Sequence, residues 1–411
     1  MRRTWPSIGT GVLLAAVIAV GCGDDGDEAG SAGAGDGGLT GEPIVLGLIS
    51  DGELASPPSP NLPTALAGAE AAAEVINADG GVNGRPIEIR ECDTRADLNA
   101  ASQCARELVG DGAVALVSAA SQVSPGFLPV VEEAGIPSIG HFPVSEADYA
   151  SEVTYPLVSG TPGLLIGQGV LVGELELERP SVVRINQDAL AEAVALADMG
   201  LAATGADVVN EVEVPPQAPD MSSYVAAATA DDTDSILAVM LPQDLVNFVS
   251  ALRQSGSEVP VIASSNTVLD ALSQGFGDDI EGVYAVGWMK PPTDTDDPAV
   301  QQFAEAMDAL DPDAPKQDLS ENSWASVHLF AEVATGLDTI DAASVTAALD
   351  QLEDYDSGLL PPVSFTEPQT LIPDLRLFNT SVLFTQVRDG MFVPLTGEFV
   401  DVFEAAASAT G

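Results

Sequence analysis

Residues 71–89 read AAAEVINADGGVNGRPIEI and join the end of a predicted helix to the start of a predicted strand. The pair Gly80-Gly81 allows the positive φ that ends a helix without a steric penalty at Cβ. Asn83-Gly84 then predicts a turn, Pro86 prevents further helix, and the alternating character of residues 87–90 is typical of a half-buried strand. Upstream, apolar residues recur at spacings of three and four, which places them on one helix face; they are Leu66, Ala69, Ala73 and Ile76.

The same alternation of short apolar strands and helices continues through the next two hundred or so residues, with a restart near residues 159–162, and it predicts parallel sheets with helices on both faces. The predicted strands are 44–49, 87–92, 114–117, 137–140, 181–185, 208–214, 236–240, 261–263 and 282–286. The predicted helices are 63–78, 98–109, one opened by Ser124-Pro125, 163–177, 189–204, 222–229, 242–255 and 268–274. Three further helices (298–310, 320–337 and 342–352) follow, and Asp389-Gly390 between the apolar runs 381–387 and 391–393 predicts a hairpin. Sequence patterns alone therefore indicate two successive α/β domains.

Length and charge narrow the class of protein. A chain of 411 residues suits two domains rather than one core. Its 13 basic and 63 acidic residues give a formal net charge of −50, so that binding to nucleic acid or to an anionic lipid surface is opposed by repulsion. We interpret the charge as an adaptation to salt or a means of solubility in preference to a specific cationic partner.

The first 22 residues are interpreted as an export signal. Arg2-Arg3 precede an apolar run, Gly11–Val20, which is too short to span a bilayer comfortably. The following Ala19-Val20-Gly21-Cys22 resembles the lipobox of bacterial lipoproteins, in which the cysteine is lipidated and becomes the new N-terminus, although leucine is usual where Ala19 stands. An ordinary secretory signal and an uncut membrane anchor are the alternatives. Residues 23–42 contain almost nothing to bury and are predicted to be a flexible acidic tether.

Cys92 and Cys104 are the remaining cysteines, one at the end of a predicted strand and one on the next helix. In an oxidising compartment such a pair indicates a local disulfide, and two reduced structural cysteines are the alternative. A metal site is not expected, because neither His141 nor His328 lies nearby in the sequence.

Motifs of enzymes are missing from the sequence. It has no Gly-x-Ser-x-Gly elbow, no phosphate-binding loop and no histidine cluster at metal-ligand spacing, so no cofactor is expected. His141, just after a predicted strand, is the one tempting catalyst, and an exported hydrolase that uses it is the alternative from another functional class. A lone loop histidine is more often a hydrogen-bonding residue, and we therefore expect no enzyme.

The motif Ile76-Asn77-x-x-Gly80-Gly81-Val82-Asn83-Gly84-Arg85-Pro86-Ile87, with Asp93 after the next strand, resembles the opening of branched-chain-amino-acid-type solute-binding proteins. These are the extracytoplasmic receptors of ABC importers, and the resemblance covers roughly residues 43–400. It implies a type I periplasmic binding protein fold, with two Rossmann-like lobes of parallel sheets joined by a three-strand hinge. Lobe I would comprise 43–158 and 293–360, and lobe II 159–292 and 361–411, with crossings near 142–159, 287–295 and 359–362.

Ligands of open α/β sheets sit beyond the carboxyl ends of the strands, so the candidate ligand residues follow those ends. Ser121 and Gln122 precede a predicted helix start whose free N–H groups can hold a carboxylate or a carbonyl oxygen; the alternative is that the serines there only cap that helix. The candidates are Asp51, Ser121, Gln122, His141 and Phe142 in lobe I, and Asn186, Met240, Leu241, Gln243 and Asn266 in lobe II.

Several of these positions depart from the pattern of the family. Phe142 and Val144 stand where Ala and Thr are usual, Leu241 falls near a characteristic tyrosine, and Ser265 or Asn266 falls near the acid that holds the ligand's ammonium group. An ammonium buried without its carboxylate would cost several kcal/mol. We therefore expect a more apolar ligand, an amide or a neutral acid in preference to an ordinary branched-chain amino acid.

The sequence as a whole predicts a lipid-anchored, extracytoplasmic receptor at the cell surface or in the periplasm. It would be a monomer that captures a small amino-acid-like, amide or apolar carboxylate ligand, and the family resemblance implies that it delivers this ligand to ABC permease subunits. A sensory protein of the same fold that reports to a signalling partner is the alternative within the fold.

Overall fold

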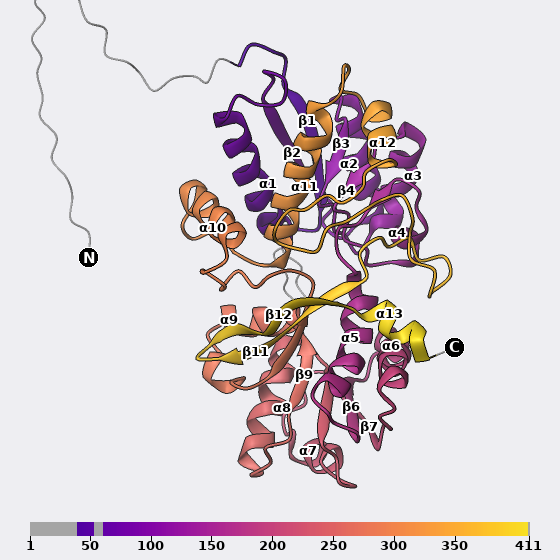
Figure 1. The fold of residues 1–411 in the computed structure, drawn as a ribbon, viewed down its shortest axis with the longest axis vertical. Coiled ribbons are helices and arrows are strands. Elements are labelled where there is room, and N and C mark those ends of the chain that lie inside the picture. Colours follow the sequence, from indigo (N-terminus) through magenta and orange to yellow (C-terminus); the bar gives the residue numbers. More distant parts are fainter. Residues whose placement is uncertain (1–38, 53–60, 410–411) are drawn as a thin grey trace, which may run out of the picture. The chain divides into compact units, whose positions relative to one another are not determined.

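The computed structural model describes residues 39–52 and 61–409, whose strands form two sheets (Figure 1). The first sheet is entirely parallel, with the strand order β2-β1-β3-β4-β5. Its strands are β1 (Ile44–Ser50), β2 (Ile87–Asp93), β3 (Ala115–Val117), β4 (Ser138–Ile139) and β5 (Thr154–Tyr155).

Helices cover both faces of this sheet. Leu46 and Leu48 of β1 join the core formed with α1 (Asn61–Ala78) and α11 (Asp318–Thr335), whereas Ile49 joins the core formed with α2 (Leu98–Gly110) and α3 (Leu128–Ala134). This division follows from the two-residue period of a strand. The same half of the molecule contains η1 (Ser124–Gly126), α4 (Glu146–Ala150), α10 (Pro298–Leu310) and α12 (Ala342–Leu349).

Helices α1 and α11 lie side by side although they are far apart in the sequence (Figure 1). A Cβ added to Gly68 of α1 would lie only 2.0 Å from the carbonyl oxygen of Ser320, so the two backbones approach one another where a side chain would not fit. This close packing determines where the N-terminal end of α11 lies.

The second sheet is mixed, with the order β12-β11-β10-β9-β8-β6-β7. Five strands are parallel, and the hairpin of β11 (Ser381–Arg388) and β12 (Met391–Asp401) adds antiparallel strands beside β10. The parallel strands are β6 (Pro180–Ile185), β7 (Asn210–Val214), β8 (Ser235–Val239), β9 (Val261–Ser264) and β10 (Tyr284–Gly287). The predicted hairpin at Asp389-Gly390 is thereby confirmed.

Two sets of helices cover this sheet as well. Leu237 of β8 shares a core with α5 (Gly160–Glu174), and its neighbours Ile236 and Ala238 share another with α8 (Pro242–Gln254). The remaining elements are α6 (Asp188–Thr204) and α13 (Val402–Ala409), which contact α5, and α7 (Ser222–Ala228), α9 (Ser265–Ser273) and η2 (Gly277–Asp279), which contact α8. The predicted α/β class with two sheets is confirmed.

Three segments connect the halves that carry the two sheets, and hydrogen bonds tie these segments together. The indole Nε1 of Trp288, which directly follows β10, donates to the carbonyl oxygen of Gly160 at 2.9 Å, at the start of α5. The amide Nδ2 of Asn379, just before β11, donates to the carbonyl oxygen of Leu157 at 2.9 Å. The first crossing is therefore bound to both of the others.

The third crossing comes later in the chain than the predicted 359–362. Val363 still pairs with Tyr355, and Phe365 packs against Tyr155 of the first sheet with ring centroids 5.1 Å apart. Arg376 also donates to the carbonyl oxygen of Thr154 at 2.6 Å. Residues up to Arg376 thus pack on the first half, because aromatic and cationic side chains of this loop find their partners on β5.

The predicted tether ends earlier than residue 42. The N–H groups of Thr40 and Gly41 donate to the carbonyl oxygen of Gly84, and Arg85 Nε donates to that of Glu42 at 2.8 Å. These residues are fixed by hydrogen bonds, which composition does not reveal. The signal segment, Cys22 and the tether up to residue 38 lie outside the described residues, and within the described part no helix is long and apolar enough to cross a membrane.

Short elements account for most of the other differences from the predictions. Helix α4 begins at a capping box of Ser145 and Asp148 and is only five residues long, too short for a periodic pattern. Strand β5 and helix α13 were also not predicted. Ser124 is not a helix cap, since it begins the short turn η1 and its hydroxyl lies 3.1 Å from that of Ser145.

Cys92 at the end of β2 and Cys104 on α2 form the predicted disulfide, with Cα atoms 5.5 Å apart. We expect the double variant Cys92→Ser, Cys104→Ser to lose about 3 kcal/mol of unfolding free energy, because the closed loop no longer restricts the unfolded chain. Urea unfolding of the oxidised protein and of the variant measures the difference. Equal stabilities would show that the disulfide contributes nothing.

Candidate functional site

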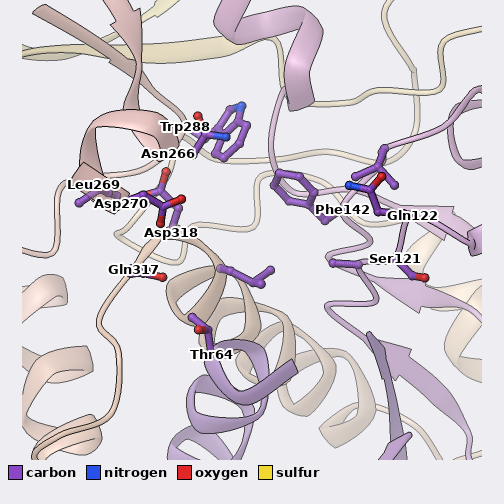
Figure 2. A pocket seen from close by; sticks show the side chains of 13 residues that line it. Thr64, Ser121, Gln122, Phe142, Asn266, Leu269, Asp270, Trp288, Gln317 and Asp318 are labelled. Carbon is purple, nitrogen blue, oxygen red and sulfur yellow. The ribbon is translucent and has the colours of Figure 1, made fainter. Parts of the chain in front are cut away.

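A cavity of about 150 Å³ lies between segments from both halves of the molecule (Figure 2). From the half with the first sheet come the start of α1, the loops after β3 and β4, and the start of α11. From the other half come α9 and the residue after β10. The lining residues are Thr64, Ala120, Ser121, Gln122, Phe142, Val144, Asn266, Leu269, Asp270, Trp288, Gln317, Asp318 and Leu319.

Two carboxyl groups face one side of this cavity. Figure 2 shows Asp270 of α9 and Asp318 of α11 close together, with Asn266 and Leu269 beside them. The hydroxyl of Ser265 donates to Asp318 Oδ2 at 2.9 Å. Lysine, arginine and histidine are missing from the lining, so among the described residues no cation balances this pair.

Burial without a cation changes the titration of both groups. Burial raises the pKa of Asp318 to about 6, the hydrogen bond from Ser265 opposes this rise, and the charge of Asp270 adds to it. Burial likewise raises the pKa of Asp270 to about 6. Ionised carboxylates at neutral pH are therefore costly here until a positive charge enters.

A third acid lies behind this pair. Glu321 is one turn further along α11, is fully buried, and has no hydrogen-bond partner for either carboxyl oxygen within the described residues. Burial, followed by the charge of Asp318, raises its pKa well above the usual value, which favours the uncharged form. Asp318 therefore has two acidic neighbours, Asp270 at the cavity and the buried Glu321.

On the opposite side of the cavity, Asp51 occupies the donors that were predicted to hold a ligand's carboxylate. Its side chain accepts from Ser121 Oγ at 2.6 Å, from the Gln122 N–H at 2.7 Å and from Thr94 Oγ1. The Ser121 hydroxyl oxygen also accepts from the Val123 N–H at 3.1 Å. Asp51 thus holds the loop after β3, and the Ser121 hydroxyl and the Gln122 N–H already donate hydrogen bonds within the protein.

The apolar wall comes from two aromatic residues at the crossings. Phe142 and Trp288 meet edge to face, with ring centroids 5.0 Å apart and planes at 81°. Because the Trp288 N–H is bound to Gly160, its ring presents carbon atoms to the cavity. The cavity therefore combines an aromatic wall with one acidic end.

A profile described as periplasmic binding protein matches residues 43–407, which is most of the chain. The chain belongs to the periplasmic binding protein family. Members of this family bind transported solutes and are not catalytic, so the prediction that the chain is not an enzyme is confirmed. No curated protein sequence matches the chain significantly.

Solved structures of this family share the fold at low sequence identity. One is an ABC transporter substrate-binding protein from Desulfitobacterium hafniense in complex with Leu (19% identity, 86% of this chain and 100% of that chain, TM-score 0.69). Another is a branched-chain amino acid transporter substrate-binding protein from Streptococcus pneumoniae in complex with isoleucine (17% identity, 87% of this chain and 99% of that chain, TM-score 0.68). A third is a fatty acid ABC transporter substrate-binding protein from Thermomonospora curvata (20% identity, 89% of this chain and 95% of that chain, TM-score 0.69). The type I fold predicted for this periplasmic binding protein is confirmed.

The predicted ligand residues divide into three groups. Ser121, Gln122, Phe142 and Asn266 line the cavity. Met240 and Leu241 line an adjacent groove that also includes Asn266. Four residues line neither space: Asp51, His141, Asn186 and Gln243.

Each of these four residues has another place in the structure. Asp51 is fully buried and holds the loop after β3, while Asn186 and Gln243 are exposed, the latter donating to Asn247. His141 is only 1% exposed, and its ring nitrogens lie 3.0 Å from Ser138 Oγ and 2.9 Å from Asp148 Oδ1. It connects β4 to α4 and is shielded from any substrate, which removes the proposed catalyst of the hydrolase alternative.

The sequence reasoning missed the two acids of the cavity. Asp270 is the single charged residue of the predicted helix 268–274, which is a weak local signal. Asp318 precedes the helix predicted from residue 320 and carried no signal. The structure thus places two carboxyl groups in the cavity, although Ser265 or Asn266 stands near the position where the family has its acid. Within the described residues no group of three or more His, Cys, Asp or Glu side chains suits a metal ion.

We expect Asp318→Asn to stabilise the ligand-free protein at neutral pH. A carboxyl with a pKa of about 6 in the folded state and about 3.9 in the unfolded state binds more protons when the protein is folded. The free energy of unfolding is therefore highest at low pH, where both states are protonated, and falls as the pH rises through 6. The variant should gain about 1 to 2 kcal/mol over the wild type at pH 7.5 and much less at pH 4. Urea unfolding at the two pH values measures this gain. The exposed Asp313→Asn variant is the control and should unfold like the wild type; a gain for Asp318→Asn that is independent of pH would contradict the electrostatic explanation.

Proposed function

We propose that the chain is the extracytoplasmic solute receptor of an ABC importer and that it captures a small organic ligand by a cationic nitrogen. The uncompensated pair Asp270 and Asp318 is the observation that supports this proposal. An ammonium group between them would regain the charge pairing that burial denies each carboxylate, and it would donate hydrogen bonds to both.

The same geometry disfavours the carboxylate ligands that the sequence left open. An anion in the cavity would meet two acidic side chains and no basic one, and the donors around Ser121 are engaged by Asp51. A zwitterionic amino acid would gain at its ammonium end and lose at its carboxylate end. We therefore rank a simple amine or amide-bearing ammonium above leucine, and leucine above an acid.

Capture is proposed to bring the two halves together around the ligand, since acidic residues from both halves would share one cation. Asp270 lies in the half with the second sheet, whereas Asp318 begins a helix of the other half. Bending at the three crossings is the hinge motion expected for such a receptor. The solved substrate-binding proteins of ABC transporters that share this fold support delivery to a permease.

Four compounds with one side chain test the charge requirement: leucinamide (cation), leucine (zwitterion), N-acetylleucinamide (neutral) and N-acetylleucine (anion). We expect leucinamide to give the largest thermal shift, because among the four compounds it is the one that carries a cation and no carboxylate. A ligand at 100 times its dissociation constant stabilises the folded protein by about 2.7 kcal/mol. Its affinity should fall by about tenfold per carboxyl between pH 7.5 and pH 5, as Asp270 and Asp318 take up protons. Asp270→Asn should weaken binding at least tenfold, whereas the exposed Asp278→Asn, which removes an equal charge, should not. Tightest binding of N-acetylleucine would overturn the proposal.

Attachment through a lipid on Cys22 is the second part of the proposed function. We expect Cys22→Ser to move the exported protein from the membrane fraction to the soluble fraction and to abolish incorporation of labelled fatty acid. Ser31→Ala, in the neighbouring tether, is the control and should stay with the membrane. Retention of Cys22→Ser in the membrane would instead indicate an uncut apolar anchor.

A further inference from the structure

A second hollow of about 590 Å³ adjoins the cavity, and we call it the apolar groove. The two spaces share Val144 and Asn266, so the groove continues from the cavity. Its aliphatic side chains come from α5, from the end of β8 and from the segment before the third crossing: Leu164, Leu165, Met240, Leu241, Ile372 and Leu375.

The acidic cavity accounts for only one end of a ligand. It is much smaller than the groove, and a ligand confined to it would leave the partly exposed side chains of Leu241, Ile372 and Leu375 in contact with water. A concave apolar surface of this kind, continuous with a few polar groups, is the usual form of a ligand site. The groove therefore suits the remainder of the same ligand.

Charge at the groove agrees with charge in the cavity. Its charged lining residues are Glu146 and Asp374, both acidic and exposed, and no basic residue lines it. A chain that ended in a carboxylate would be repelled at either end of the combined space. An uncharged chain attached to a cationic head is not repelled anywhere along it.

We propose that the ligand is an amphiphilic amine, with its ammonium group at Asp270 and Asp318 and its aliphatic chain in the apolar groove. This inference rests on the proposed function, which supplies the cationic head. It adds that chain length, beyond the size of a leucine side chain, determines affinity.

Binding of a series of linear amines tests the proposal. The full chain carrying Cys22→Ser is purified without detergent and titrated calorimetrically with butyl-, hexyl-, octyl- and decylammonium below their micelle concentrations. Affinity should rise by about fourfold per added methylene until the groove is filled. Carboxylates of the same lengths should bind at least a hundredfold more weakly.

Two variants test whether the alkyl chain binds in the apolar groove. Leu241→Asn and Ile372→Asn each place an amide in the groove, and each should reduce the ratio of octyl- to butylammonium affinity by about tenfold. Both residues are partly exposed, and Ile372 is held through backbone bonds with Gln369 that survive the substitution. Leu98→Asn replaces a leucine that is 54% exposed on α2 and should leave the ratio unchanged. Thermal unfolding without ligand confirms that all three variants are folded.

The outcomes separate this inference from the proposed function. If butylammonium and leucinamide bind but longer chains gain nothing, the groove is not the chain site and the inference is overturned while the proposed function stands. If alkyl carboxylates bind better than amines at pH 7.5, both are overturned. A length dependence that survives Leu241→Asn and Ile372→Asn places the chain elsewhere and also overturns the inference.

Discussion

The hydrogen bonds that join the three crossings are the constraint on which the site depends. Trp288 donates to Gly160, and Asn379 donates to Leu157, so the first crossing is tied to the second and the third. Because these donors are buried, losing their acceptors would leave unsatisfied groups at a cost of about 1 to 3 kcal/mol each. The hydrogen bonds thereby keep the three crossings next to one another. The carboxyl ends of strands from both sheets then face a common space.

Aromatic packing at the crossings serves the ligand as well as the fold. Trp288 uses its N–H for the crossing and its ring for the cavity wall, where it meets Phe142 edge to face. The side chain that ties the halves together therefore also shapes the site between them. Movement at the crossings would therefore alter the aromatic wall of the cavity directly.

The carboxyl groups of the cavity are the part of the site for which the protein provides no partner of opposite charge. Asp270 and Asp318 are costly in the ligand-free protein because burial removes their hydration and no basic residue replaces it. Asp51 shows the contrasting solution, since hydroxyl and N–H donors surround its buried carboxylate. Asp270 and Asp318 instead face a cavity whose lining includes no basic residue.

The sequence by itself determined the features that depend on neighbours along the chain. Helix and strand periods, the Gly80-Gly81 stop, the Asp389-Gly390 hairpin and the pairing of Cys92 with Cys104 all involve short separations, and all of these were predicted correctly. The family motif around Asn83 added the return of the last helices to the first sheet.

Only the tertiary structure decided which side chains form the site. Asp270 and Asp318 are two acids among 63, and the only local signal is that Asp270 is the single charged residue of its predicted helix. They meet because α1 and α11 pack backbone to backbone at Gly68 and because the crossings bring α9 to the same space. The segment up to Arg376 likewise stays on the first half through contacts with Tyr149 and Thr154, far away in the sequence. Burial and charge pairing are sums over distant residues, so they arise only when the chain has folded.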